Sequence, residues 1–280
     1  MSLIASIFLG FVQGVAEFLP ISSSGHLSIF QNFMGLADVE HDHMFFDVLL
    51  HLGTLVAVIV AYWSDIVEIV KEFFAMIRGF SGKGESLNGP VPPARRMILL
   101  IIVGTLPLLV VLPIKDKVEM LYSNTIFIGC ALIFNGLVLW LSDRMNRGGK
   151  TEKNATLKDA LIVGCFQAVA VVPGLSRSGS TITGGLLNGF NREFAVKFSF
   201  MLSLPAVLGA NILSLVDVIT EGGVDTALLP IYFAGVVSAM VFGYLSIRLL
   251  KFIAKKGSFG GFAYYCWVVG VATLILSAIS

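Results

Sequence analysis

Two short polar turns interrupt an otherwise apolar chain, and they carry the residues whose types could do chemistry. The first reads EFLPISSSGHL (residues 17–27) and the second reads VPGLSRSGST (residues 172–181). Together they supply a carboxylate from Glu17, several hydroxyls, an imidazole from His26 and a guanidinium from Arg177. A nucleophile, a proton-handling group and a cationic clamp are the components that phosphoryl transfer needs. The two turns therefore raise the hypothesis of a phosphoryl-transfer site.

Composition indicates that these turns lie in a membrane. The 280-residue chain is 56% hydrophobic and 13% charged, whereas a soluble domain has roughly a quarter charged residues. Its mean hydropathy is +0.88. The net charge of +1 gives no support for a nucleic-acid partner. The three cysteines lie far apart in apolar segments, so their spacing indicates neither a zinc site nor a disulfide framework.

The apolar stretches predict an all-α polytopic membrane protein. Six of them approach the length of about 20 residues that a spanning helix needs. They are 44–63, 97–114, 124–141, 198–218, 228–249 and 261–279. Two shorter stretches, 3–19 and 160–172, each run into a proline, a Ser- and Gly-rich turn and a second short apolar piece. This pattern predicts two broken re-entrant hairpins, whose backbone must be satisfied by protein or by water inside the membrane.

The distribution of lysine and arginine gives the predicted orientation. If the six spans cross and the two hairpins return, the basic loops 64–96 and 142–160 fall on the same side, together with the basic residues near 192–197 and 248–256. The positive-inside rule makes this side cytoplasmic. We therefore expect a multi-pass membrane protein, with the first hairpin entering from outside and the second from the cytoplasm.

A shift of 154 positions aligns the two hairpins with each other. The matched pairs are Gly10 with Gly164, Gln13 with Gln167, Ser22 with Ser176, Ser24 with Ser178, and Gly25 with Gly179. Each unit is then one hairpin followed by three spans, and an odd number of spans turns the second copy upside down. We predict a single membrane domain of two inverted repeats, 1–142 and 160–280, joined by a cytoplasmic linker, 143–159. Such repeats typify secondary transporters, with a site at the repeat interface.

Both turns precede short helices, and helix N-termini bind anions. Hydroxyl groups that could add donors to a phosphate cradle are those of Ser22, Ser24, Ser176, Ser178 and Thr181. Arg177 adds a fork-shaped cation suited to phosphate. The two copies are not equivalent, because only the first has Glu17 and His26 and only the second has Arg177. A symmetric transport cradle would not need a carboxylate and an imidazole on one side, so this asymmetry favours chemistry.

Each candidate residue also has a purely structural interpretation. Glu17 and Arg177 could form an ion pair that only holds the hairpins together. The serines could act only as helix caps and interhelical hydrogen bonds, and His26 could cap a carbonyl group. For Asp47 and His51, which lie in an apolar span, the sequence favours structural polar bonding.

The turn residues resemble those of the bacterial undecaprenyl-diphosphate phosphatase family, integral-membrane proteins also called bacitracin-resistance proteins. The first family motif matches Gln13, Glu17, Pro20, Ser22, Ser23, Ser24, Gly25 and His26. The second matches Pro173, Gly174, Ser176, Arg177, Ser178 and Thr181. The resemblance covers nearly the whole chain. Many family members have Glu where this chain has Gln13, and an amide offers an oxygen but no charge, so Gln13 is a weaker metal-ligand candidate.

The resemblance implies hydrolysis of undecaprenyl diphosphate to undecaprenyl phosphate and inorganic phosphate. This reaction recycles the lipid carrier of peptidoglycan synthesis and gives bacitracin resistance. A divalent metal, Mg²⁺ or Ca²⁺, is implied, with Glu17 as a ligand or proton handler. The resemblance also implies a location in the bacterial cytoplasmic (inner) membrane, with the site open to the outer face. Ser23 would be the nucleophile and His26 would assist proton transfer, while Arg177, Ser176 and Thr181 would hold the diphosphate. Attack by an activated water in place of Ser23 stays open.

A transporter or flippase of a prenyl phosphate lipid is the alternative function. The inverted repeat favours transport, whereas the asymmetric Glu17 and His26 favour an enzyme. In both cases the expected partners are a prenyl phosphate or diphosphate lipid and the bilayer, without nucleic acid, and the sequence leaves a homodimer open.

Overall fold

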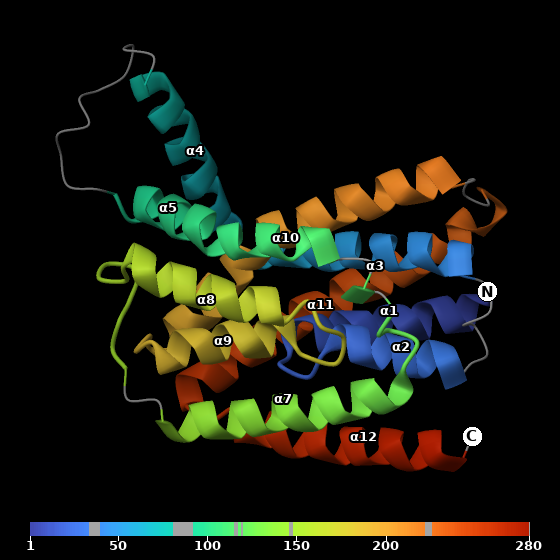
Figure 1. Ribbon diagram of the computed structural model, residues 1–280. Helices are drawn as coiled ribbons and strands as arrows, with labels where there is room; N and C mark the ends of the chain where they lie inside the picture. Colours follow the sequence, from blue (N-terminus) through green and yellow to red (C-terminus); the bar gives the residue numbers. More distant parts are fainter. Residues whose placement is uncertain are drawn as a thin grey trace.

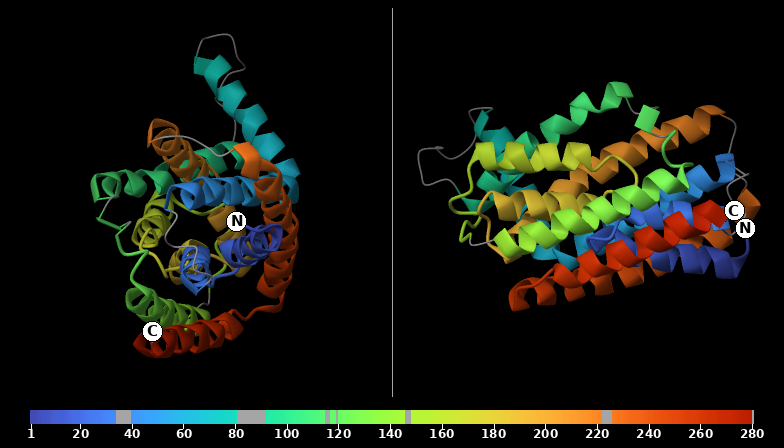
Figure 2. Two further views of the ribbon diagram at one scale, coloured as in Figure 1. Left: turned by 90° about the vertical axis from the view of Figure 1, so that its right-hand side faces the viewer. Right: turned by 60° about the horizontal axis from the view of Figure 1, so that its bottom comes forward.

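The computed structural model describes residues 1–33, 40–80, 92–114, 117–118, 120–145, 148–221 and 226–279. In these residues the chain is helical and forms no strand; its only β-type pairing is an isolated bridge between Lys150 and Phe190. Most helices run side by side along one axis (Figure 1), as expected for helices that share a bilayer. Figure 2 shows α7 (Thr125–Met145) and α12 (Gly260–Ile279) together at one edge, and these two helices pack against each other.

Five apolar segments of the described chain are long enough to cross a membrane. They are Pro93–Ile114, Thr125–Arg144, Arg192–Val216, Leu229–Lys256 and Gly260–Ile279. The first consists of α5 (Pro93–Thr105) and two short 3₁₀ turns, and the others lie in α7, α10 (Arg192–Glu221), α11 (Leu229–Lys256) and α12. These segments correspond to five of the six predicted spans. The all-α polytopic class is confirmed.

The remaining predicted span, 44–63, is the first arm of a bent pair. Residues Phe45–Ala61 lie in α3 (Glu40–Ala61), and the chain then turns by 88° into Trp63–Gly79 of α4 (Trp63–Phe80). The sequence analysis left residues 64–80 in a cytoplasmic loop, because charged residues recur there. Residues 64–80 instead belong to an amphipathic helix, α4, that projects away from the bundle (Figure 1). Counting the bent pair as one span gives six in the described residues.

The two broken segments form hairpins of short helices. The first consists of α1 (Leu3–Phe18) and α2 (Ser23–Phe33), and the second of α8 (Leu157–Val169) and α9 (Arg177–Leu187). Figure 1 shows α1 and α8 starting at opposite ends of the bundle, so that the two turns approach each other in its interior. The repeat boundaries themselves, 1–142 and 160–280, stay a prediction.

Each hairpin is packed closely against a span through a pair of glycines. A Cβ added at Gly10 of α1 would overlap the carbonyl oxygen of Gly235 in α11, and one added at Gly164 of α8 would overlap that of Gly104 in α5. Small residues permit such close helix contacts in membranes. Because Gly10 and Gly164 are aligned by the shift of 154, the two hairpins use equivalent positions to dock, which fixes the depth of both turns in the bundle.

Candidate active site

The first turn is shaped by a proline and by one residue in a left-handed conformation. Leu19 ends α1 with extended backbone (φ −71°, ψ 145°), as expected for a residue that precedes proline. Ser22 has a φ of +73° and is the only non-glycine with positive φ in the described chain. Its hydroxyl oxygen accepts a hydrogen bond from the backbone N–H of Gly25 at 3.2 Å, which is the geometry of an N-cap. Ser23 is therefore the first residue of α2.

The second turn repeats this capping arrangement. Ser176 is the N-cap of α9, and its hydroxyl oxygen accepts from the N–H of Gly179 at 3.1 Å. The Ser176 and Ser178 hydroxyls share a hydrogen bond of 3.1 Å, as the Ser22 and Ser24 hydroxyls do at 3.4 Å. Arg177 is the first residue of α9, so it occupies the position that Ser23 holds in the first hairpin.

A buried asparagine of α7 joins the two turns. The Asn135 amide nitrogen donates to the carbonyl oxygen of Pro20 at 3.0 Å, and its amide oxygen accepts from the N–H of Ser176 at 3.1 Å. The Ser178 hydroxyl also donates to the carbonyl oxygen of Leu19 at 3.2 Å. The starts of α2 and α9 are thus held against each other. The sequence analysis missed Asn135, although an isolated amide in an apolar span was a usable signal.

Glu17 is the centre of a hydrogen-bonded cluster between the two turns. It is 7% exposed, and one carboxylate oxygen accepts from the Arg177 guanidinium in an ion pair. The other oxygen accepts from the Ser23 hydroxyl at 2.6 Å and from the Gln13 amide at 3.2 Å. A hydroxyl that donates to a buried carboxylate is the arrangement of a nucleophile and its general base. The structure therefore brings together Glu17, Ser23, Arg177 and Gln13, four of the residues singled out from the sequence.

Two polar residues of α3 extend this cluster. His51 Nε2 lies 3.9 Å from the Glu17 oxygen that bonds Ser23, and His51 Nδ1 lies 2.7 Å from the backbone carbonyl oxygen of Asp47. The Asp47 carboxylate accepts from the Gln31 amide at 3.0 and 3.2 Å. The sequence interpretation favoured structural bonding for Asp47 and His51. Their spacing of four residues on one helix was the signal that they continue a polar face toward Glu17.

The ring nitrogens of His26 contact groups outside this cluster. Its Nδ1 lies 2.7 Å from the carbonyl oxygen of Ser22, and its Nε2 lies 2.8 Å from the hydroxyl of Tyr265 in α12. Both ring nitrogens are thus engaged by groups other than Ser23 and Glu17. The expected assistance of His26 in proton transfer stays a prediction, and Tyr265 is a neighbour that the sequence analysis did not find.

The hydroxyl of Thr181 is also engaged by the protein. It donates to the backbone carbonyl oxygen of Arg177 at 2.9 Å and shares a hydrogen bond of 2.6 Å with the hydroxyl of Ser199 in α10. These contacts tie the first turn of α9 to α10. The role of Thr181 in holding a diphosphate stays a prediction.

The residues present fit a divalent cation only in part. The amide oxygen of Gln13 is buried without a hydrogen-bond partner, so it is available as a ligand beside the Glu17 carboxylate. Within the described residues no group of three or more His, Cys, Asp or Glu side chains could hold a metal ion. Mg²⁺ and Ca²⁺ take six or more oxygen ligands, and Mg²⁺ commonly shares its site between a carboxylate and substrate phosphates. A cation would therefore need oxygens from a bound ligand as well.

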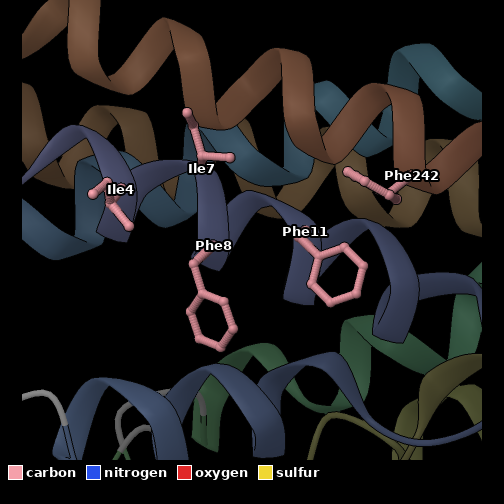
Figure 3. A pocket seen from close by; sticks show the side chains of 5 residues that line it. All are labelled: Ile4, Ile7, Phe8, Phe11 and Phe242. Carbon is pink, nitrogen blue, oxygen red and sulfur yellow. The ribbon is translucent and has the colours of Figure 1, made fainter.

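An apolar hollow lies on the same helix as Glu17, nearer its N-terminal end. It has a volume of about 380 Å³ and is lined by Ile4, Ile7, Phe8, Phe11 and Phe242 (Figure 3). The lining offers no polar group, so the hollow can take part in hydrocarbon contact but not in chemistry.

Comparison with known proteins agrees with the motifs. Residues 6–272 match the family described as "Bacitracin resistance protein BacA". Proteins named undecaprenyl-diphosphatase include one from Methanosphaera stadtmanae, 42% identical over 100% of this chain and 99% of the relative, and one from Alkaliphilus metalliredigens, 42% identical over 99% of each chain. One from Carboxydothermus hydrogenoformans is 39% identical over 99% of this chain and 98% of the relative. The chain therefore belongs to the bacitracin resistance protein BacA family.

Proposed function

We propose that this membrane protein hydrolyses undecaprenyl diphosphate to undecaprenyl phosphate and inorganic phosphate. The relatives of similar length carry the name of this activity. The observation that carries the proposal is the contact of Ser23 and Arg177 with the same buried carboxylate, Glu17. A transport cradle needs anion-binding groups but has no use for a hydroxyl that is hydrogen-bonded to a base.

The geometry suggests a mechanism in two displacements. The Ser23 oxygen attacks the terminal phosphorus and its proton passes to Glu17, which it already contacts. The bond from phosphorus to the bridging oxygen breaks, and undecaprenyl phosphate leaves with the proton that Glu17 took from Ser23. Water then attacks the phosphoserine and gives a proton to the Glu17 carboxylate. The bond from phosphorus to the Ser23 oxygen breaks, inorganic phosphate leaves, and Glu17 returns the proton to Ser23. If water attacks the substrate directly, Glu17 acts on that water and only one displacement occurs.

Charge on the phosphates would be balanced by groups that already meet at this point. The Arg177 guanidinium is suited to bidentate contact with phosphate, and the N-termini of α2 and α9 add partial positive charge. Further donors would be Ser22, Ser24, Ser176, Ser178 and Thr181. A Mg²⁺ or Ca²⁺ ion, held by Glu17, Gln13 and the diphosphate oxygens, would supply additional neutralisation of the substrate charge.

Orientation and assembly follow from the same proposal. The basic loops support a cytoplasmic position for one face of the bundle, and the site would then open to the outer face of the bacterial cytoplasmic (inner) membrane. The prenyl chain would stay in the bilayer while its headgroup enters the polar cluster. A homodimer is compatible with this arrangement.

Phosphate release from undecaprenyl diphosphate by the purified protein in detergent tests the proposal. Wild type, Ser23→Ala and the control Ser123→Ala are compared with and without EDTA. Ser123 is an exposed serine whose hydroxyl donates to the nearby carbonyl of Met120. We expect metal-dependent release by wild type and the control and none by Ser23→Ala. Release that survives Ser23→Ala would assign the attack to water. A folded wild type without release would contradict the proposal and favour transport.

A further inference from the structure

We propose that Tyr265 is a positioning residue for the first turn, which acts through His26 to hold Ser23 against Glu17. The inference rests on the proposed function, since it assigns a task within the phosphatase site. It also gives His26 a role in shaping the turn. The family resemblance implied instead that this histidine assists proton transfer.

The first turn depends on an unfavourable backbone conformation. Ser22 adopts a φ of +73°, which lies in the left-handed region that residues other than glycine rarely adopt. The second turn uses a glycine, Gly174, for its own positive φ of 87°, so it needs no compensation. A residue such as Ser22 persists in this conformation only when its surroundings hold it there.

His26 supplies that constraint through two hydrogen bonds to one atom. The carbonyl oxygen of Ser22 accepts from the backbone N–H of His26 at 3.2 Å and lies 2.7 Å from its Nδ1. A carbonyl oxygen can only accept, so Nδ1 must carry a proton. In the neutral ring Nε2 is then an acceptor. The ring therefore fastens the carbonyl of the residue that directly precedes Ser23.

Tyr265 fixes the ring of His26 in that orientation. Its hydroxyl lies 2.8 Å from the His26 Nε2 and is the donor when the ring is neutral, and the two rings stack with centroids 5.6 Å apart and planes 12° from parallel. The next residue of α12, Cys266, lies near the same turn. The Asn135 amide, which donates to the carbonyl oxygen of Pro20, also donates to the Cys266 sulfur at 3.4 Å. A donor at Nε2 stabilises the tautomer with a proton on Nδ1, which is the tautomer that the Ser22 carbonyl requires.

Removal of the Tyr265 hydroxyl should therefore loosen the turn without removing a reacting group. The fraction of molecules with Ser23 aimed at Glu17 would fall, which lowers kcat. Arg177 and the second turn would be unchanged, so KM should stay within about twofold. The loss of one neutral hydrogen bond corresponds to a decrease of roughly five- to tenfold in kcat.

The test compares Tyr265→Phe with the matched control Tyr264→Phe in phosphate release. Tyr264 is the neighbouring tyrosine of α12 and packs edge-on against Trp267. We expect the loss of kcat in Tyr265→Phe alone, with a melting temperature lowered by no more than the loss of one hydrogen bond and unchanged in Tyr264→Phe. In a His26→Asn background, where the amide replaces Nδ1 and Nε2 is absent, adding Tyr265→Phe should change kcat by less than about twofold. Losses that multiply in the double variant would overturn the proposal.

A second readout does not depend on activity, so failure of this inference and failure of the proposed function are distinguishable. Nitrogen NMR of the ¹⁵N-histidine-labelled protein reports the tautomer of each ring. We expect His26 to carry its proton on Nδ1 in wild type and in Tyr264→Phe. In Tyr265→Phe only the Ser22 carbonyl still favours the Nδ1 proton, so rings that leave this carbonyl should add a fraction of the Nε2-protonated form. An Nε2-protonated His26 in wild type, or an unchanged spectrum in Tyr265→Phe, would overturn the proposal even if phosphate release is normal.

Discussion

The first and second turns share a scaffold and differ in chemistry. In both, a capping serine precedes a short helix, and a second serine pairs with the cap. The residue between these serines is Ser23 in the first turn and Arg177 in the second, and Glu17 aligns with Val171. The shared scaffold brings two helix N-termini together. The residues that differ between the two turns supply the base, the hydroxyl and the cation.

The comparison also explains why Glu17 lies where it does. Two helix N-termini that meet repel each other, because each carries partial positive charge. The Glu17 carboxylate bonds the first residue of each helix, Ser23 of α2 and Arg177 of α9. It therefore relieves the repulsion as well as acting as the proposed base. An anionic diphosphate would occupy the same electrostatic environment.

Among changes at positions where the two turns differ, Glu17→Gln should cause the largest loss of phosphate release. The amide keeps the size of the side chain but removes the base and leaves Arg177 without its counter-ion. We expect phosphate release to fall by about 10²- to 10⁴-fold, the range of general-base catalysis. Val171→Ala changes the aligned position in the second hairpin and should leave release within about twofold. Comparable losses in both variants would show that these positions matter for packing alone.

Arg177→Lys should have the next largest effect. Lysine keeps the charge but lacks the planar fork that contacts a carboxylate and a phosphate at once. We expect a decrease of about 10²-fold in kcat, similar to the removal of one electrostatic contact in a transition state. Steady-state phosphate release over a range of substrate concentrations measures it. A rise in KM alone would instead assign Arg177 to ground-state binding.

The parts of the site that could be predicted from the sequence are those with local signals. Glu17, Ser23 and Arg177 lie in turns whose serines, glycines and prolines stand out from the apolar chain. Asn135 and Tyr265 lie in apolar spans outside these turns, and each has a partner more than 100 residues away in sequence. No local pattern shows which face of a helix meets a distant turn, so these contacts required the structure.

The same reasoning applies to the fold. Spans are predictable because a bilayer demands long apolar helices, and five of the six expected ranges are spanning segments. Helix α4 was not predicted, because a search for long apolar segments treats a stretch with several charged residues as a loop. Its amphipathic spacing, with Asp65, Glu68 and Glu72 among apolar residues, was the available signal.

A smaller effect, on stability, should come from breaking the link between the turns. Asn135→Leu would leave the buried N–H of Ser176 without its acceptor and the carbonyl oxygen of Pro20 with only the weak Cys266 thiol donor at 3.8 Å. Each unsatisfied buried group costs about 1–3 kcal/mol, so the melting temperature in detergent should fall clearly. Asn135→Asp keeps an acceptor for Ser176 but has a donor for the Pro20 carbonyl only when its carboxyl group is protonated, so its melting temperature should be intermediate at low pH and fall further as the pH rises. An unchanged melting temperature in Asn135→Leu would contradict the role of Asn135 as the link.

The smallest effect on stability should come from removing the two helix N-caps. The kinetic changes in these variants would show whether the caps only stabilise the turns or also position the reacting groups. Ser22→Ala and Ser176→Ala each remove one cap, and both should cost about 1 kcal/mol of stability. Their effects on phosphate release should differ, because Ser22 directly precedes Ser23 whereas Ser176 precedes Arg177. We expect Ser22→Ala to lower kcat, since it disturbs the aim of the hydroxyl at Glu17, and Ser176→Ala to raise KM, since it disturbs the group proposed to hold phosphate. Identical kinetic changes in the two variants would mean that the caps serve only to fasten the turns, and that the asymmetry of the site begins at Ser23 and Arg177.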